Sequence, residues 1–104
     1  MKHVISSGAA PGAIGPYSQA IEAGGLVFVS GQLPIDATTG LMAEGAEAQA
    51  RQSLENIKHI LASVGLDMEH IVKTTVFLAD MSYFAPMNAV YATFFNNECP
   101  ARSA

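Results

Sequence analysis

The chain has 104 residues, of which half are apolar and only 13% are charged, and its formal net charge is −4. This composition excludes an intrinsically disordered protein, which has few apolar residues and many charges. The five basic residues are scattered along the chain, whereas a nucleic-acid binder needs a concentrated cationic surface to displace counterions from phosphates, so we expect no nucleic-acid partner.

The sequence also indicates a cytoplasmic protein without a membrane partner. A membrane-spanning helix needs about 20 consecutive apolar residues, and no run approaches that length. The N-terminus lacks the apolar core and cleavage site of a secretory signal. The single cysteine, Cys99, rules out an intrachain disulfide and fits a reducing compartment. Because charge is scarce, we expect part of the apolar surface to face another subunit; the alternative is a monomer with an alanine-rich surface.

The first third of the chain predicts three short strands. Strand character is confined to residues 2–5, 17–23 and 26–30. An irregular loop rich in glycine, alanine and proline is expected over residues 6–16. Gly24 and Gly25 supply the positive φ values that a tight hairpin turn needs. Because residues 26–29 are apolar at every position, we expect both faces of that strand to be covered.

The clearest element is an amphipathic helix that follows a loop over residues 31–45. Its apolar residues recur at spacings of three and four, which places them along one stripe. They are Ala46, Ala50, Leu54, Ile57, Leu61 and Val64. Gly65 comes directly afterwards, as is typical of a left-handed helix stop.

The second half of the chain predicts a long strand, a second helix and the entry to a further strand. Residues 71–79 are rich in β-branched side chains and should form a central strand, preceded by a short turn that Asp67 caps. The second helix should begin at residues 82–84 and continue through Phe95, burying Met87, Val90, Tyr91 and Phe94. Residues 99–104 then enter another strand. This order indicates an α+β fold with two helices on one face of a mixed sheet and the other face bare.

No pattern typical of metal, phosphate or covalent chemistry is present. The three histidines do not pair at helical spacing and no Cys-x-x-Cys occurs, so no metal site is predicted. The glycines of residues 8–15 match no phosphate-binding motif, and no Gly-x-Ser-x-Gly turn occurs. Cys99 has no evident base nearby in the sequence, and we interpret it as an inert thiol. We therefore expect neither a metal nor another cofactor.

Four unusual local features remain. Residues 15–18, Gly-Pro-Tyr-Ser, open a strand with a rigid turn and a tyrosine. Residues 30–32, Ser-Gly-Gln, end a buried strand, where a glycine admits the close approach of a ligand. Asn88 lies in an otherwise apolar helix, and Arg102 is a solitary arginine after Pro100. Taken singly, each fits an ordinary turn or surface residue.

Taken together, these features resemble one family over essentially the whole chain. The matching segments are residues 13–20 (AIGPYSQA), 29–34 (VSGQLP), 52–60 around Asn56, 72–78 (VKTTVFL), Met87-Asn88 with Tyr91, and Pro100-Ala101-Arg102-Ser103. The sequence resembles the Rid family, the RidA-type enamine/imine deaminases that are also called YjgF-like or endoribonuclease L-PSP proteins.

The resemblance implies a fold of the chorismate-mutase type, with residues 1–104 as a single domain. It also implies a homotrimer in which three sheets form a central barrel, the helices lie outside and ligand sites occupy the clefts between subunits. Such an assembly would cover the bare sheet face. Family members continue for roughly another strand or two. The sequence therefore looks as if it lacks the last strand and the glutamate thought to position the water.

The resemblance also implies a set of site residues. Arg102 corresponds to the arginine that clamps the substrate carboxylate, and it is the expected catalytic residue. Other positions of the substrate pocket correspond to Tyr17, Ser30, Gly31 and Asn88. Ala104 stands where RidA proteins often have cysteine, and its backbone would still line the pocket.

The implied reaction is hydrolytic deamination of 2-aminoacrylate or 2-iminobutanoate to a 2-oxo acid and ammonia. An imino acid is already electrophilic at C2, so hydrolysis needs a held carboxylate and a placed water but no metal or covalent nucleophile. The guanidinium of Arg102 offers two parallel N–H donors that match a carboxylate, and orientation supplies much of the acceleration.

Two alternatives remain open. A trimer with the same pocket would bind 2-oxo acids or other small carboxylates without catalysis, and the missing glutamate favours this interpretation. RNA cleavage is implied by the older family name, endoribonuclease L-PSP, but the net negative charge and the scattered basic residues argue against it.

Overall fold

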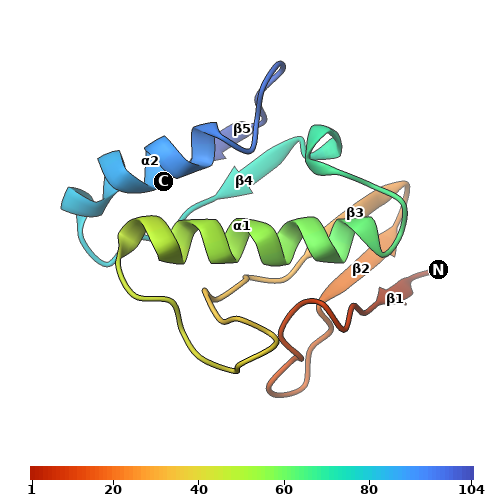
Figure 1. The fold of residues 1–104 in the computed structure, drawn as a ribbon. Helices are drawn as coiled ribbons and strands as arrows, with labels where there is room; N and C mark the ends of the chain where they lie inside the picture. Colours follow the sequence, from red (N-terminus) through yellow and green to blue (C-terminus); the bar gives the residue numbers. More distant parts are fainter.

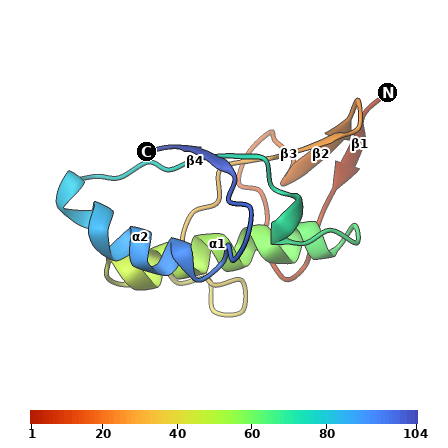
Figure 2. The same ribbon diagram turned by 90° about the horizontal axis from the view of Figure 1, so that it is seen from above.

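The computed structural model describes residues 1–104 and arranges them in two layers, with the strands on one side and both helices on the other (Figures 1 and 2). In chain order the elements are β1 (His3–Ile5), β2 (Ala20–Ala23), β3 (Leu26–Val29), α1 (Ala46–Ala62), the 3-10 turn η1 (Met68–His70), β4 (Lys73–Thr75), the 3-10 turn η2 (Met81–Tyr83), α2 (Phe84–Ala92) and β5 (Ala101–Ser103). The predicted α+β class is confirmed. No helix has both the length and the apolarity needed to cross a bilayer.

The N-terminal strands form an antiparallel sheet in the order β1-β2-β3. The hairpin turn between β2 and β3 lies where it was predicted, with φ values of 59° at Gly24 and 77° at Gly25. β2 begins three residues later than expected. The reason is a tight bend in which the Tyr17 amide donates to the Gly15 carbonyl at 2.9 Å, so this part of the chain cannot extend into a ladder.

The two faces of this sheet have different environments. On the inner face, Ile5 and Ala20 are buried with Ile60 of α1, and Val29 packs against them. On the outer face, the cross-strand row Val4, Ile21 and Phe28 is apolar, and Val4 and Phe28 are 63% and 58% exposed. The expectation that both faces of residues 26–29 are covered is therefore wrong within one chain, because both helices pack on the same side (Figure 2).

The main core lies between the two helices and the strands. Leu54 and Leu61 of α1 are buried against Met87, Val90 and Tyr91 of α2, which confirms the predicted apolar stripes at these positions, whereas Phe94 lies beyond α2 and is only half-buried. Each such burial stabilises the fold by about 1.5–3 kcal/mol. Val64 is an exception. It lies beyond the last turn of α1 and is 40% exposed, because the helix ends at Ala62 before the left-handed Gly65.

A second, parallel sheet of two strands pairs β4 with β5. The predicted long strand over residues 71–79 is reduced to Lys73–Thr75, because its only partner, β5, is itself three residues long. The expected entry strand at residues 99–104 is confirmed as β5. The expected single mixed sheet is instead divided into an antiparallel and a parallel part, since no strand of residues 1–104 is hydrogen-bonded between β3 and β4.

Local capping determines where the short turns begin. The Asp67 carboxylate accepts the Glu69 amide at 3.0 Å, as expected for the predicted cap, and the His70 ring accepts the Asp67 amide in return. Asp80 starts η2 in the same way, and the hydrogen bond from the Ser82 amide holds the pKa of the Asp80 carboxyl below its ordinary value. α2 ends at Ala92 rather than Phe95, where the Thr93 hydroxyl donates to the Val90 carbonyl.

Candidate active site

Arg102 occupies the middle position of β5, and its side chain lies on the side of the sheet that faces α2. Its neighbours Ala101 and Ser103 are exposed, whereas Arg102 is half-buried, as the alternation of a strand requires. Its Nη1 donates to Oδ1 of Asn88 at 2.7 Å. The predicted pair of Arg102 and Asn88 is therefore brought together by the fold, although 14 residues separate them in sequence.

Three side chains of one face of α2 hold the guanidinium. Phe84, Asn88 and Tyr91 are spaced by four and three residues, which places them in one row along the helix. The guanidinium carbon of Arg102 lies 4.7 Å from the ring centroid of Tyr91 and 5.3 Å from that of Phe84, within the range of a cation–π contact. Phe84 and Tyr91 were not predicted as site residues. Their spacing around Asn88 is a sequence signal that places them on the same face of α2 as Asn88, but it does not reveal Arg102 as their partner.

The charge of Arg102 has no carboxylate partner in the chain. The two contacts between basic and acidic side chains in the structure join His59 to Glu55 and His70 to Asp67, and neither involves Arg102. Asn88 supplies a hydrogen bond but no negative charge. A guanidinium has five N–H donors, and Asn88 accepts only one of them. The remaining donors form a fork that fits a carboxylate, and because the cation is half-buried, an anion there is screened less than one in open water.

The other predicted pocket residues lie in the N-terminal half of the chain. The Ser30 hydroxyl donates to the Ser18 carbonyl at 2.6 Å, and Tyr17 is half-exposed, with its hydroxyl accepting the Ile14 amide at 3.4 Å. Gly31 does not have a left-handed φ, and a Cβ placed on it would meet no atom of the chain within 4 Å. The space beside Gly31 is therefore open, and the fold of one chain does not itself require glycine there.

Two buried amides fix the loops that carry this second group. The side chain of Gln19 is 6% exposed and bonds the loop before Tyr17, accepting the Ser7 amide at 2.6 Å and donating to the Pro11 carbonyl at 2.7 Å. Asn56 of α1 is fully buried and donates to two carbonyls of the loop after Gly31. Its acceptors are Leu33 O at 3.1 Å and Ile35 O at 3.0 Å. Sequence reasoning did not assign these positioning roles.

One chain does not bring the two groups together. Figure 1 shows the loop of residues 6–18 on one side of α1 and β5 on the other, and no hydrogen bond links Tyr17, Ser30 or Gly31 to Arg102 or Asn88. Ala104 follows β5 and is exposed. The chain thus presents two candidate half-sites, one with the cation and one with hydroxyl groups and an open backbone.

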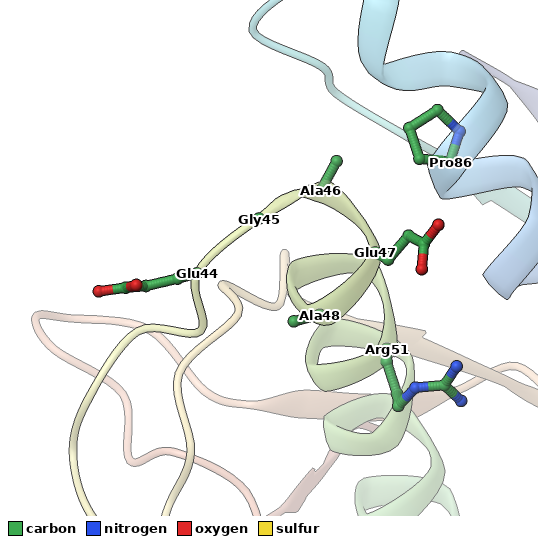
Figure 3. A pocket seen from close by; sticks show the side chains of 7 residues that line it. All are labelled: Glu44, Gly45, Ala46, Glu47, Ala48, Arg51 and Pro86. Carbon is green, nitrogen blue, oxygen red and sulfur yellow. The ribbon is translucent and has the colours of Figure 1, made fainter.

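A separate open hollow lies at the N-terminal end of α1 (Figure 3). Its volume is about 530 Å³, and its lining consists of Glu44, Gly45, Ala46, Glu47, Ala48, Arg51 and Pro86. Arg51 shares this hollow with two carboxylates, so the local charge is not positive. It contains none of the predicted site residues. The chain has no group of three His, Cys, Asp or Glu side chains that could hold a metal ion.

Comparison with known protein families decides the membership of this chain. The family model of endoribonuclease L-PSP matches residues 7–104. The chain belongs to this family. The resemblance to Rid proteins is thereby confirmed.

Relatives of known name cover nearly the whole chain. It is 51% identical over 106 residues to the 2-iminobutanoate/2-iminopropanoate deaminase of Salmonella typhimurium, covering 99% of this chain and 83% of that protein. The crystal structure of RidA from an Antarctic Psychrobacter species has a TM-score of 0.95 at 42% identity, covering 98% of this chain and 83% of that one. Escherichia coli TdcF with bound serine has a TM-score of 0.93 at 44% identity, covering 97% and 82%.

Proposed function

We propose that this protein is an enamine/imine deaminase, which hydrolyses 2-imino acids such as 2-iminobutanoate and enamines such as 2-aminoacrylate to 2-oxo acids and ammonia. The observation that carries the proposal is the guanidinium of Arg102, which Asn88 holds at 2.7 Å without neutralising it. The name of the Salmonella relative supports the same reaction.

The geometry around Arg102 suits an α-carboxylate. Two parallel N–H donors would bind the two carboxylate oxygens and so fix both the position and the plane of the substrate. The rings of Phe84 and Tyr91 lie against the guanidinium and limit its movement. With the carboxylate held, C2 of the imine takes a defined position. The loss of translational and rotational entropy is then paid on binding rather than at the reacting step, which lowers the barrier.

Hydrolysis of the imine then needs one water and two proton transfers. An enamine such as 2-aminoacrylate first becomes the imine by taking a proton at C3 and losing one from nitrogen. Water then adds to C2 of the imine while one of its protons passes to nitrogen. In the resulting carbinolamine the hydroxyl proton passes to nitrogen, the C2–N bond breaks, and ammonia leaves as the C2–O bond becomes the carbonyl of the 2-oxo acid. Among the proposed pocket residues of this chain, backbone carbonyls and the hydroxyl groups of Tyr17 and Ser30 can orient the water.

We further propose that the complete pocket forms between subunits of a homotrimer with a chorismate-mutase-like arrangement. Tyr17, Ser30 and Gly31 of one subunit would complete the half-site of Arg102 and Asn88 in its neighbour. The support is twofold. The two half-sites are separate within a chain, and the outer face of β1–β3 presents an apolar surface that includes exposed Val4, Leu26 and Phe28. Such a patch is typical of a protein–protein contact.

The proposed activity is tested by generating imines in place. A dehydratase or an amino-acid oxidase produces 2-aminoacrylate or 2-iminobutanoate, and the rate of ammonia release is measured with and without the purified protein. We expect release to be accelerated, and the Arg102→Ala variant to remove the acceleration.

Two outcomes would contradict the proposal. Binding of 2-oxobutanoate without any acceleration would favour a carboxylate-binding protein that is not a catalyst. RNase activity that survives repurification, with no effect on imines, would favour the RNA-cleaving interpretation.

A further inference from the structure

A second group of contacts links Arg102 to a residue of the neighbouring strand β4 through the ring of Tyr91 in α2. Thr74 of β4 lies directly opposite Arg102 in the parallel register of the two strands. Its Oγ1 is 2.7 Å from the hydroxyl oxygen of Tyr91, and the ring of Tyr91 lies 4.7 Å from the guanidinium carbon of Arg102. Thr74, Tyr91 and Arg102 therefore form one continuous chain of contacts between the small sheet and α2.

The Tyr91 ring is fixed on several sides. Tyr91 is 7% exposed, and its ring packs against that of Phe95 with centroids 4.7 Å apart. The hydroxyl is satisfied by Thr74, which is itself half-buried. A buried hydroxyl without a partner is costly, so the hydrogen bond between Thr74 and Tyr91 favours a single orientation of the Tyr91 ring. That orientation determines where the ring face beside Arg102 lies.

Asn88 alone does not fix the guanidinium. A single hydrogen bond to Nη1 leaves the guanidinium free to tilt about that contact, whereas a flat ring beneath it limits the tilt. Packing of the core would need only an apolar ring at position 91. The pair of hydroxyl groups adds orientation, and orientation is what a bidentate carboxylate contact requires.

We propose that Thr74 and Tyr91 are positioning residues for the deamination reaction: the hydrogen bond between their hydroxyl groups holds the Tyr91 ring under the guanidinium of Arg102, so that the free N–H donors of Arg102 face the substrate carboxylate. This inference rests on the proposed function, and it adds to the site two residues that never touch the substrate.

The kinetic test uses Tyr91→Phe, Thr74→Val and the double variant. Each single change removes one hydroxyl with little change of volume and leaves the other hydroxyl without its partner. We expect each to raise KM for the imine and Kd for 2-oxobutanoate by roughly 5- to 30-fold. The double variant should have a KM and a Kd no higher than those of the more impaired single variant, because both changes remove the same hydrogen bond.

Thr75→Val is the matched control. It makes the same substitution one residue along β4 at an exposed position, and it should leave KM and Kd unchanged. A role in stability alone would lower the melting temperature and the fraction of active enzyme, which reduces the apparent kcat without moving KM. That pattern, or effects that simply add in the double variant, would overturn the proposal.

A spectroscopic readout separates this inference from the proposed function. The chain has only two arginines, Arg51 and Arg102, so their Nε–Hε resonances can be assigned with an Arg102→Lys sample. Tyr91→Phe and Thr74→Val should shift or broaden the Arg102 resonance and leave that of Arg51 in place. If wild-type protein neither binds 2-oxobutanoate nor releases ammonia, the proposed function fails, and an unchanged Arg102 resonance in both variants refutes the positioning role independently.

Discussion

At the scale of single residues, the site depends on a cation that is held without being neutralised. Asn88 accepts a hydrogen bond from Arg102, and two aromatic rings lie against the guanidinium, but none of these groups carries a negative charge. The protein as a whole is negative, so its overall field does not attract an anionic imino acid. We therefore propose that binding depends on the local charge of Arg102.

Replacing Arg102 should remove substrate binding while the fold remains intact. Loss of a charge-assisted bidentate contact costs about 2–5 kcal/mol, or roughly 30- to several-thousand-fold in affinity, so Arg102→Ala should abolish detectable binding of 2-oxobutanoate. Arg102→Lys should restore little, because an ammonium cannot reproduce the planar fork. Titration of wild type and both variants measures this. Equal affinities in all three proteins would identify Arg102 as an ordinary surface residue.

The neutrality of Asn88 leads to a second prediction. Asn88→Asp places a carboxylate at hydrogen-bond distance from the guanidinium, which pairs with the cation and repels the substrate carboxylate. We expect the affinity for 2-oxobutanoate to fall by at least about tenfold, which corresponds to about 1.4 kcal/mol. Asn88→Ala removes the hydrogen bond without adding charge and should cost less. An Asp variant that binds as well as the Ala variant would show that neutrality at position 88 is unimportant.

At the scale of elements, buried amides connect helices to the loops that carry the second half-site. Asn56 donates to two carbonyls of the loop after Gly31 and accepts a hydrogen bond from Gln52, so all of its polar atoms in α1 are used. Gln19 does the same for the loop before Tyr17. These loops contain little regular structure, and their shape depends on these contacts.

Removing the Asn56 amide should therefore destabilise the protein. Asn56→Leu keeps the branched shape and the number of heavy atoms but leaves the carbonyls of Leu33 and Ile35 without donors, and each buried unpaired group costs about 1–3 kcal/mol. We expect the free energy of unfolding in urea to fall by at least about 2 kcal/mol. Lys58→Ala, on the exposed side of the same helix, is the control and should change it by less than about 0.5 kcal/mol. Equal stabilities of the two variants would contradict this role for Asn56.

At the scale of the whole molecule, the chain leaves one sheet face uncovered. Only 13 of its 104 residues are buried, while the outer face of β1–β3 exposes Val4, Leu26 and Phe28. Both helices lie on the opposite side (Figure 2). A single chain thus exposes large apolar side chains on one sheet face, and this supports the proposed assembly together with the separation of the two candidate half-sites.

The proposed trimer is tested by light scattering at micromolar concentration. We expect a mass of three times 10.9 kDa for the wild type. Phe28→Glu places a charge in the apolar row of the outer face and should dissociate the assembly and reduce deamination together. Lys58→Glu, on the exposed side of α1, should do neither. A folded wild-type protein that is active as a monomer would refute the assembly.

The elements and residues that depend on local rules were determined by the sequence itself. The stripe of α1, the Gly24-Gly25 hairpin and the Asp67 cap follow from periodicity and turn chemistry, and Arg102 and Asn88 were identified by the motifs that contain them. Strand lengths were not predictable in this way, because β4 can be no longer than the partner with which it pairs. It was also not predictable that Arg102 contacts Phe84 and Tyr91, or that Tyr91 contacts Thr74, since those contacts depend on how α2 lies across the small sheet. Only the tertiary structure showed that Tyr17, Ser30 and Gly31 lie apart from Arg102, because no local pattern encodes that β3, which precedes Ser30, and β5, which carries Arg102, belong to separate sheets.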